Sequence, residues 1–147
     1  GLGSVPLIME KQFGEVFRFT GVELDESVID LATRYTLPRM ISPVQLIRSD
    51  AGQFAEITED KFDLIAIDIF LDDEIPKVFK TAGFLNAVKA ILSPGGIVIM
   101  NTLAVTEADK RSSDRFFNNT FIQVFPEGKI IGIPGNQMLI SSASYVK

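Results

Sequence analysis

A glycine turn at the start of the chain, followed one βα unit later by an acidic strand end, restricts the fold more than any other feature. The chain opens with Gly1-Leu2-Gly3-Ser4-Val5-Pro6, and Val22-Glu23-Leu24-Asp25 closes an apolar run. Glycines let the backbone approach a nucleotide closely, and a carboxylate roughly 20 residues later can bind the two ribose hydroxyls. The spacing therefore predicts a nucleotide-binding α/β fold. Because Pro6 stands where the dinucleotide fingerprint has its third glycine, a simple strand-to-helix turn remains the alternative.

Composition indicates one folded domain with a restricted chemistry. The chain has 147 residues, of which 46% are hydrophobic and 22% charged, and it contains neither cysteine nor histidine. Disulfides, thiolate nucleophiles, zinc sites of the Cys/His type and histidine bases are thereby excluded, so proton transfer would depend on carboxylates, tyrosine, lysine or water. A net charge of −5 argues against a nucleic-acid partner. No apolar run approaches the roughly 20 residues that span a bilayer, and we expect a cytoplasmic protein without a membrane partner.

Predicted strands and helices alternate along the chain, as in a mostly parallel α/β sheet. We expect strands at residues 17–24, 44–48, 62–69 and 97–101. The first expected helix begins at Asp25 or Glu26, and the others cover residues 51–57, 81–92 and 107–118. The 62–69 strand is the most apolar, which is typical of a central strand buried on both faces. Two last strands, at 121–125 and 138–143, are separated by prolines and glycines, which predicts an antiparallel pair at the sheet edge.

Carboxylates follow the first two predicted strands. Asp25 is well placed to cap the next helix, because its side chain can accept from backbone amides near Ile29. Glu23 is harder to explain by structure alone, since a carboxylate at the end of a buried strand is costly unless a partner such as a ribose pairs with it. Asp50 can cap the following helix or accept a hydrogen bond from the exocyclic amine of an adenine, and its position does not separate these roles.

Asp68 ends the most apolar strand, at the edge where open α/β sheets bind ligands. Because the chain has no histidine, Asp68 is the natural base to deprotonate or orient an amine. The following loop adds Asp72, Asp73 and Glu74. Close carboxylates repel one another, so this group would hold a proton or attract a cation. A merely solvated acidic loop is the alternative.

Together these motifs resemble the class I S-adenosylmethionine-dependent methyltransferase fold and, within it, the spermidine synthase-like branch. The resemblance covers essentially the whole chain, beginning with the glycine motif. Its most specific match is the ribose motif Val22-Glu23-Leu24-Asp25-Glu26-Ser27-Val28-Ile29. Asp50-Ala51 is similar to the adenine-side motif, and Asp68 falls where the family's catalytic aspartate lies. The turn before the fifth strand of this fold is similar to Leu92-Ser93-Pro94-Gly95-Gly96.

The resemblance implies a single domain over residues 1–147 with a Rossmann-like three-layer sandwich. Its mostly parallel sheet would have an antiparallel C-terminal edge pair and would lack the central first strand, so we expect an N-terminally truncated chain. The implied ligand is S-adenosylmethionine or its decarboxylated form, and the residues implied to contact it are Gly1, Gly3, Ser4, Glu23, Leu24, Asp50 and Ala51. Asp68 would activate the amine nucleophile, with Asp72 and Asp73 on the amine side.

The chain also departs from the branch. True spermidine synthases follow the catalytic aspartate with Ser-Ser-Asp-Pro, where this chain has Ile69-Phe70-Leu71-Asp72-Asp73. Asn101-Thr102 replaces the family's glutamine, and the N-terminal hairpin that helps enclose the polyamine is missing. The leading hypothesis is a transferase that alkylates a small cationic amine, and related synthases suggest a homodimer by analogy. A non-catalytic domain that keeps the fold for assembly or ligand sensing and a nicotinamide-dependent oxidoreductase are the alternatives.

Overall fold

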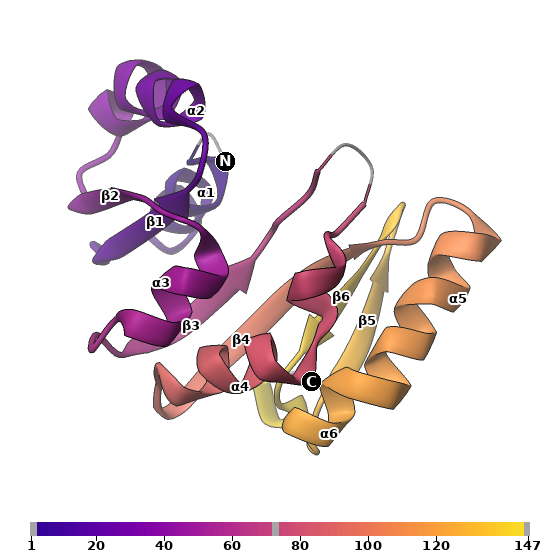
Figure 1. The fold of residues 1–147 in the computed structure, drawn as a ribbon. Helices are drawn as coiled ribbons and strands as arrows, with labels where there is room; N and C mark the ends of the chain where they lie inside the picture. Colours follow the sequence, from indigo (N-terminus) through magenta and orange to yellow (C-terminus); the bar gives the residue numbers. More distant parts are fainter. Residues whose placement is uncertain (1–2, 72–73, 146–147) are drawn as a thin grey trace. The chain divides into compact units, whose positions relative to one another are not determined.

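A computed structural model describes residues 3–71 and 74–145 (Figure 1). The chain divides into two compact units, residues 1–54 and 55–147, and the division falls inside helix α3 (Ala51–Ile57). Each unit has its own sheet. We therefore describe each of them by itself.

The first unit is built on a parallel pair of strands. β1 (Phe19–Glu23) pairs with β2 (Val44–Arg48), and the register sets Glu23 opposite Arg48. Between them lies α2 (Glu26–Leu31), whose helical path continues through a π turn (Ala32–Thr36) and a 3-10 turn (Leu37–Arg39). Parallel strands require a long crossover of this kind. The predicted helix after the first strand is confirmed.

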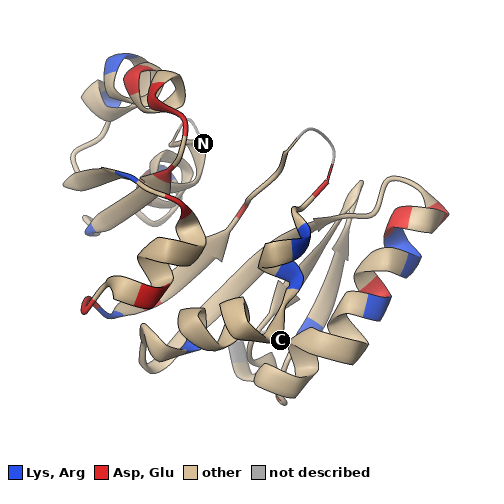
Figure 2. Cartoon of the chain, viewed as in Figure 1, with Lys and Arg blue, Asp and Glu red and all other residues tan. Residues whose placement is uncertain are grey.

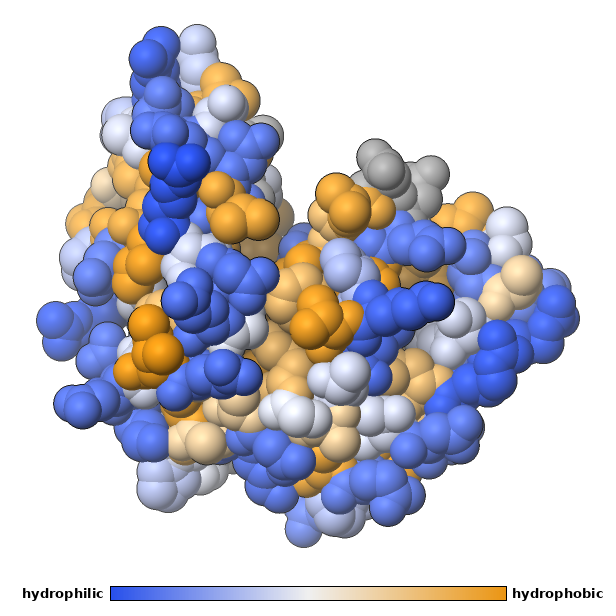
Figure 3. Space-filling model, in the orientation of Figure 1, coloured by the Kyte–Doolittle hydropathy of each residue, from blue (hydrophilic) through white to orange (hydrophobic). Residues whose placement is uncertain are grey.

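Helix α1 (Ser4–Phe13) precedes this βαβ unit and lies between two glycines with left-handed backbone conformations. Gly3 has a φ of 78° and Gly14 a φ of 67°, values that other residues adopt only at a cost. No side chain of α1 is fully buried, and Ile8 and Phe13 are exposed. Figure 3 shows apolar side chains (orange) among hydrophilic ones (blue) on the surface of the protein.

The second unit contains a four-stranded sheet with the order β3-β4-β6-β5. β3 (Phe62–Ile67) and β4 (Leu92–Leu103) are parallel and are connected through α4 (Ala82–Ala90). β6 (Asn136–Ile140) is antiparallel to β4 and to β5 (Lys129–Ile133). The expected antiparallel edge pair is therefore present, although one of its strands lies elsewhere in the sequence.

Helices and a buried core complete this unit. A 3-10 turn (Lys77–Lys80) precedes α4, and α5 (Glu107–Phe116) continues into a π turn (Phe117–Phe121) and α6 (Ile122–Val124). A last 3-10 turn covers Ala143–Tyr145. The largest fully buried side chains come from α4, β4, β6 and the π turn, and they are Phe121, Leu85, Met100, Leu139 and Val98. Close packing of such side chains is the main source of stability in a core of this kind.

Residues 121–125 form the end of a helix and not the predicted strand. Phe121 closes the π turn and is followed by α6. Its ring centroid lies 5.8 Å from that of Phe117 and 5.0 Å from that of Phe125. Aromatic residues that recur every four positions share one face of a helix. The edge strand is β5 instead, and the Pro134-Gly135 turn joins it to β6.

The prediction that strand 62–69 is buried on both faces is also wrong. Of β3 only Ile67 is buried, whereas Asp63 and Ala66 are exposed. Within the described residues β3 pairs with β4 alone, just as β1 pairs with β2 alone. An outermost strand has fewer neighbours to cover its faces than a central one. None of the helices in the described part of the chain is long and apolar enough to cross a membrane.

Candidate functional site

The end of β1 carries the first group of candidate residues. The Glu23 carboxylate folds back onto its own backbone, and its Oε1 accepts hydrogen bonds from the amide of Leu24 at 2.8 Å and that of Asp25 at 3.1 Å. Partial burial raises the pKa of Glu23, the hydrogen bonds from the Asp25 and Leu24 amides are among the contacts that lower it, and the net pKa lies below its ordinary value. Glu23 is thus an oriented, ionised acceptor at the carboxyl end of a parallel strand.

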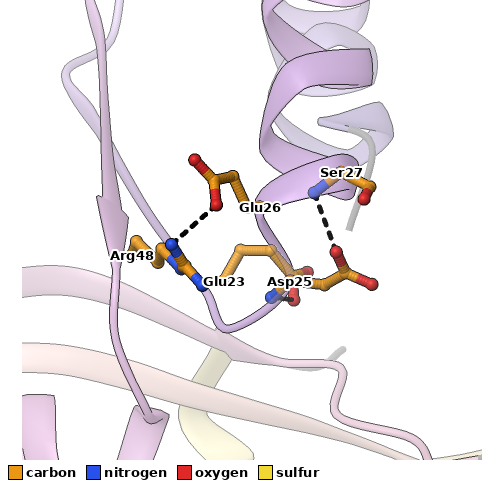
Figure 4. Close-up of polar contacts among 5 residues, drawn as sticks. All are labelled: Glu23, Asp25, Glu26, Ser27 and Arg48. Carbon is orange, nitrogen blue, oxygen red and sulfur yellow. Dashed lines mark hydrogen bonds and ion pairs between the residues drawn. The ribbon is translucent and has the colours of Figure 1, made fainter.

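Asp25 caps helix α2, as the sequence predicts. Its Oδ1 accepts a hydrogen bond from the amide of Ser27 at 2.8 Å (Figure 4). One position on, Glu26 pairs with Arg48 of β2 at 2.7 Å between Nη1 and Oε2, and the two side chains point toward each other in Figure 4. Both side chains of this pair are largely exposed, at 61% and 68%, and such surface pairs contribute about 0–1 kcal/mol. The turn between β1 and α2 is correspondingly acidic, and it is red in Figure 2.

The end of β2 lies directly beside the end of β1. Ser49 is the first residue beyond the last pair of the two strands, and its amide donates to the carbonyl of Glu23 at 3.1 Å. Asp50 follows and caps α3, since its Oδ1 accepts from the amide of Gln53 at 3.0 Å. Of the two roles left open for Asp50, the capping role is confirmed, and contact with an adenine stays a prediction. Ala51 is the first residue of α3, and Leu24 is exposed.

The glycine turn leads into α1. Gly3 precedes the helix, its carbonyl accepts from the amide of Leu7 at 3.3 Å, and Ser4 is the first helical residue. A Cβ on Gly3 would lie 3.0 Å from Cγ2 of Thr36, so the turn is both left-handed and tightly packed. The prediction for Gly1 falls outside the described residues.

The second unit places Asp68 directly after β3, at the carboxyl end of that strand. Its Oδ1 accepts a hydrogen bond from Nδ2 of Asn101 on β4 at 2.9 Å. The Oδ1 of Asn101 in turn accepts from Nδ2 of Asn136 on β6 at 2.8 Å. The predicted amine-side residues Asp72 and Asp73 lie outside the described residues.

Sequence reasoning missed Asn136 and noted Asn101 only as a departure from the family pattern. Met100 pairs with Ile67, so Asn101, the next residue of β4, lies beside Asp68, which directly follows the end of β3. Such a pair can be anticipated where a polar residue follows each of two apolar runs that are expected to pair as parallel strands. Asn136 could not be anticipated in this way, because its contact with Asn101 depends on the register of β6 against β4.

A second polar cluster occupies the neighbouring positions of the same strands and is buried. Thr102 shares a hydrogen bond with Ser113 at 2.7 Å and donates to the carbonyl of Gln137 at 2.8 Å. The Nε2 of Gln137 donates to Oδ1 of Asp114 at 3.0 Å, which ties β6 to α5. Along a strand successive side chains alternate between faces, so this cluster and the Asn101 amide lie on opposite faces of the sheet. The cluster anchors α5, whereas the partly exposed amides of Asn101 and Asn136 are the ones at the candidate site.

The structure thus brings Glu23, Leu24, Asp50 and Ala51 to one end of the β1–β2 pair. It places Asp68 at the equivalent end of β3 in the other unit, together with two asparagines. Within residues 3–71 and 74–145, no group of three or more carboxylates is arranged to hold a metal ion. Oriented carboxylates such as Glu23 and Asp68 offer hydrogen-bond acceptance and proton transfer.

Solved structures with the same fold identify its class. The crystal structure of human methyltransferase-like protein 13 in complex with SAH is 25% identical and has a TM-score of 0.76, covering 97% of this chain and 68% of that chain. A probable spermidine synthase from Corynebacterium glutamicum ATCC 13032 is 24% identical with a TM-score of 0.79, covering 98% of this chain and 53% of that chain. The fold is therefore the α/β Rossmann-like fold of methyltransferases, as expected.

A curated relative and a family model point to one branch of this fold. The relative is a probable polyamine aminopropyl transferase of Bifidobacterium longum (strain NCC 2705), 28% identical over 121 residues. The matched region is 82% of this chain but 26% of that protein, so the chain spans about a quarter of its relative's length. The family model describes the spermine/spermidine synthase domain and matches residues 12–134. This chain belongs to the spermine/spermidine synthase domain family.

Proposed function

We propose that this protein transfers an aminopropyl group from decarboxylated S-adenosylmethionine to a small amine. Membership of the spermine/spermidine synthase domain family supports this reaction class. The observation that carries the proposal is the Asp68 carboxylate, which stands at the carboxyl end of β3 with one oxygen held by Asn101. A base of this kind is what the transfer requires, because the attacking amine must lose a proton.

The nucleotide would bind at the ends of β1 and β2. Glu23 is a suitable acceptor for two ribose hydroxyls, because it is kept ionised and a carboxylate offers about four lone-pair positions. Leu24 exposes an apolar side chain beside it that could lie against the base. Asp50 and Ala51 open α3 and would contact the adenine, while Gly3 and Ser4 would approach the rest of the nucleotide at the start of α1. These residues fit an S-adenosyl nucleotide in chemistry and in their placement at strand ends.

Asp68 would then act on the amine. One proton of the ammonium form passes to the Asp68 carboxylate, and the freed nitrogen forms a bond to the aminopropyl carbon next to the sulfonium. The C–S bond breaks at the same time, and sulfur keeps the electron pair as a neutral thioether. Because the sulfonium is already a good leaving group, orientation of the nucleophile would account for much of the rate. The acidic character of the loop after β3 favours a cationic acceptor.

Methyl transfer is a second candidate, favoured by two observations. The structure of methyltransferase-like protein 13 that contains SAH covers nearly the whole of this chain. The residues after Asp68, Ile69-Phe70-Leu71, also differ from the Ser-Ser-Asp-Pro expected of true spermidine synthases. Both reactions use an S-adenosyl nucleotide and a base, so the nucleotide that is preferred separates them.

The test is calorimetric titration of the full natural protein with S-adenosylmethionine and with its decarboxylated form, followed by product analysis with short aliphatic diamines. Calorimetry suits the chain because it has no tryptophan to report binding by fluorescence. We expect preference for the decarboxylated nucleotide and an aminopropylated product. Preference for the intact nucleotide with a methylated product would show the second function. Binding without any turnover would instead indicate a non-catalytic domain, and binding of neither nucleotide would refute both transferase proposals.

A further inference from the structure

Asp68 is the first member of a directed chain of hydrogen bonds. Asn101 donates to its Oδ1 at 2.9 Å, and Asn136 donates to the Oδ1 of Asn101 at 2.8 Å. The three side chains come from β4, from β6 and from the residue that follows β3. Each has its place set by strand register, because Asn101 pairs with Met138 and Asn136 is the diagonal neighbour on the same face.

The direction of the chain follows from its first hydrogen bond, in which the amide nitrogen of Asn101 donates to a carboxylate oxygen of Asp68. A carboxylate can only accept, so the amide nitrogen of Asn101 must face Asp68. This leaves the carbonyl oxygen of Asn101 pointing the other way, where it needs a donor. Asn136 supplies that donor, and an acceptor at position 136 would instead favour the reversed amide of Asn101. The orientation of one amide therefore controls the orientation of the next.

We propose that Asn101 and Asn136 are positioning residues that hold Asp68 in one orientation, so that its second oxygen faces the amine acceptor. The inference rests on the proposed function for the identity of the amine. Asp68 is exposed and follows the end of a strand, so backbone pairing alone does not fix its side chain. Asn136 is only partly exposed and lies next to the Pro134-Gly135 turn, whose short connection holds it firmly. The amide chain thus transfers the rigidity of the hairpin to an otherwise loosely held base.

The decisive variants form a series at position 136, whose side chain contacts Asn101 and reaches Asp68 only through it. Asn136→Ala removes the donor, Asn136→Asp replaces it with an acceptor of the same shape, and Asn136→Gln retains an amide. Asn118→Ala is the matched control, because Asn118 also donates a side-chain amide hydrogen bond, at 2.8 Å to the carbonyl of Asp114, on a different element.

In the full natural protein we expect Asn136→Ala to lower kcat roughly tenfold, the effect of losing one hydrogen bond in a chain that ends on a charge. Asn136→Asp should lower kcat further, because it favours the reversed amide of Asn101. Its added negative charge would at the same time keep or lower the KM of the cationic amine. Asn136→Gln should recover part of the rate, and the KM of the nucleotide should be the same in all variants. A purely structural role would lower thermal stability without this split between kcat and KM.

A second measurement is independent of turnover. In ¹H–¹⁵N spectra, Asp68→Ala should shift the side-chain amide signals of Asn101 and of Asn136, while that of Asn118 stays in place. Wild-type kcat in both Asn136→Ala and Asn136→Asp, or an Asn136 signal that ignores Asp68→Ala, would overturn the inference. If the wild-type protein turns over no amine but both signals shift, the proposed function fails and the directed amide chain stands.

Discussion

Glu10 and Ser42 are joined by a short hydrogen bond across 32 positions of the chain. The amide of Ser42 donates to Oε2 of Glu10 at 2.6 Å, and the amide of Ile41 donates to both carboxylate oxygens at 3.0 Å. The hydroxyl of Ser42 in turn accepts from the amide of Phe17 at 3.1 Å. The carboxylate of Glu10 on α1 thereby fixes the segment that leads into β2. These amide donors bind the ionised form of Glu10 more strongly than the protonated form.

The pKa of Glu10 is therefore lowered, chiefly by the Ser42 side chain and then by the Ile41 and Ser42 amides. A lowered pKa in the folded state adds stability above the ordinary glutamate value of about 4.3, and this stability is lost as the pH falls through the folded value. We expect Glu10→Gln to reduce the free energy of unfolding at neutral pH and to flatten its decline in acid. Urea titrations between about pH 7 and pH 3 test this. The exposed Glu59→Gln is the control, and an equal effect of the two substitutions would contradict the prediction.

Gly3 and Gly14 give a matched pair of substitutions at the two ends of α1. Both have a positive φ, but a Cβ would meet Cγ2 of Thr36 at 3.0 Å only at Gly3, whereas it would meet nothing within 4 Å at Gly14. Gly14→Ala should cost about 1 kcal/mol through backbone strain, and Gly3→Ala should cost more because a contact must also move. Thermal unfolding of the two variants compares them. Equal losses would mean that Thr36 yields freely and that the turn tolerates a side chain.

Local sequence signals were sufficient to predict the bounds of an element where a proline or a capping residue marks its start. The strand at 44–48 and the helix at 51–57 have the same bounds in the structure, because Pro43 precedes the first and Asp50 caps the second. The run at 121–125 misled because a short apolar stretch fits a strand and a buried helix equally well. The spacing of Phe117, Phe121 and Phe125 was the signal for a helix.

Some residues of the candidate site could likewise be predicted from local sequence, whereas others could not. Asp25 and Asp50 could be recognised as caps from their neighbours in sequence, and Asp68 from its place after an apolar strand. Asn136 could not be recognised, because its contact with Asn101 depends on the β4–β6 register, and misplacing the preceding strand removes that register. Contacts between distant segments require the topology, which no local pattern supplies.

Substitutions of Glu23 and Asp25, at the turn between β1 and α2, should have different effects on stability and on nucleotide binding. Asp25→Ala should lower the free energy of unfolding by about 1 kcal/mol, because α2 loses its cap, and should leave nucleotide affinity nearly unchanged. Glu23→Gln keeps an acceptor oxygen for the Leu24 and Asp25 amides but loses the charge that would bind ribose. We expect it to weaken nucleotide binding by roughly 10- to 100-fold, the range for hydrogen bonds to a charged group. Calorimetry gives the affinities, and full affinity in Glu23→Gln would remove Glu23 from the proposed site.

The start of α5 offers a test of a reciprocal cap. The Thr106 hydroxyl accepts from the amide of Asp109 at 3.2 Å, while Oδ2 of Asp109 accepts from the amide of Thr106 at 2.8 Å. The Thr106 hydroxyl also donates to Oδ2 of Asp109 at 2.8 Å, and the bonds from the amide and the hydroxyl of Thr106 lower the pKa of Asp109. Thr106→Ala should destabilise the protein by about 1 kcal/mol, and Thr106→Ser should restore most of the loss because the hydroxyl is the capping group. Because a lowered carboxylate pKa stabilises only above its unfolded value, the difference between Thr106→Ala and the wild type should shrink as the pH falls below about 4. A difference that stays constant from neutral to acidic pH would show that Thr106 stabilises the helix without the help of Asp109.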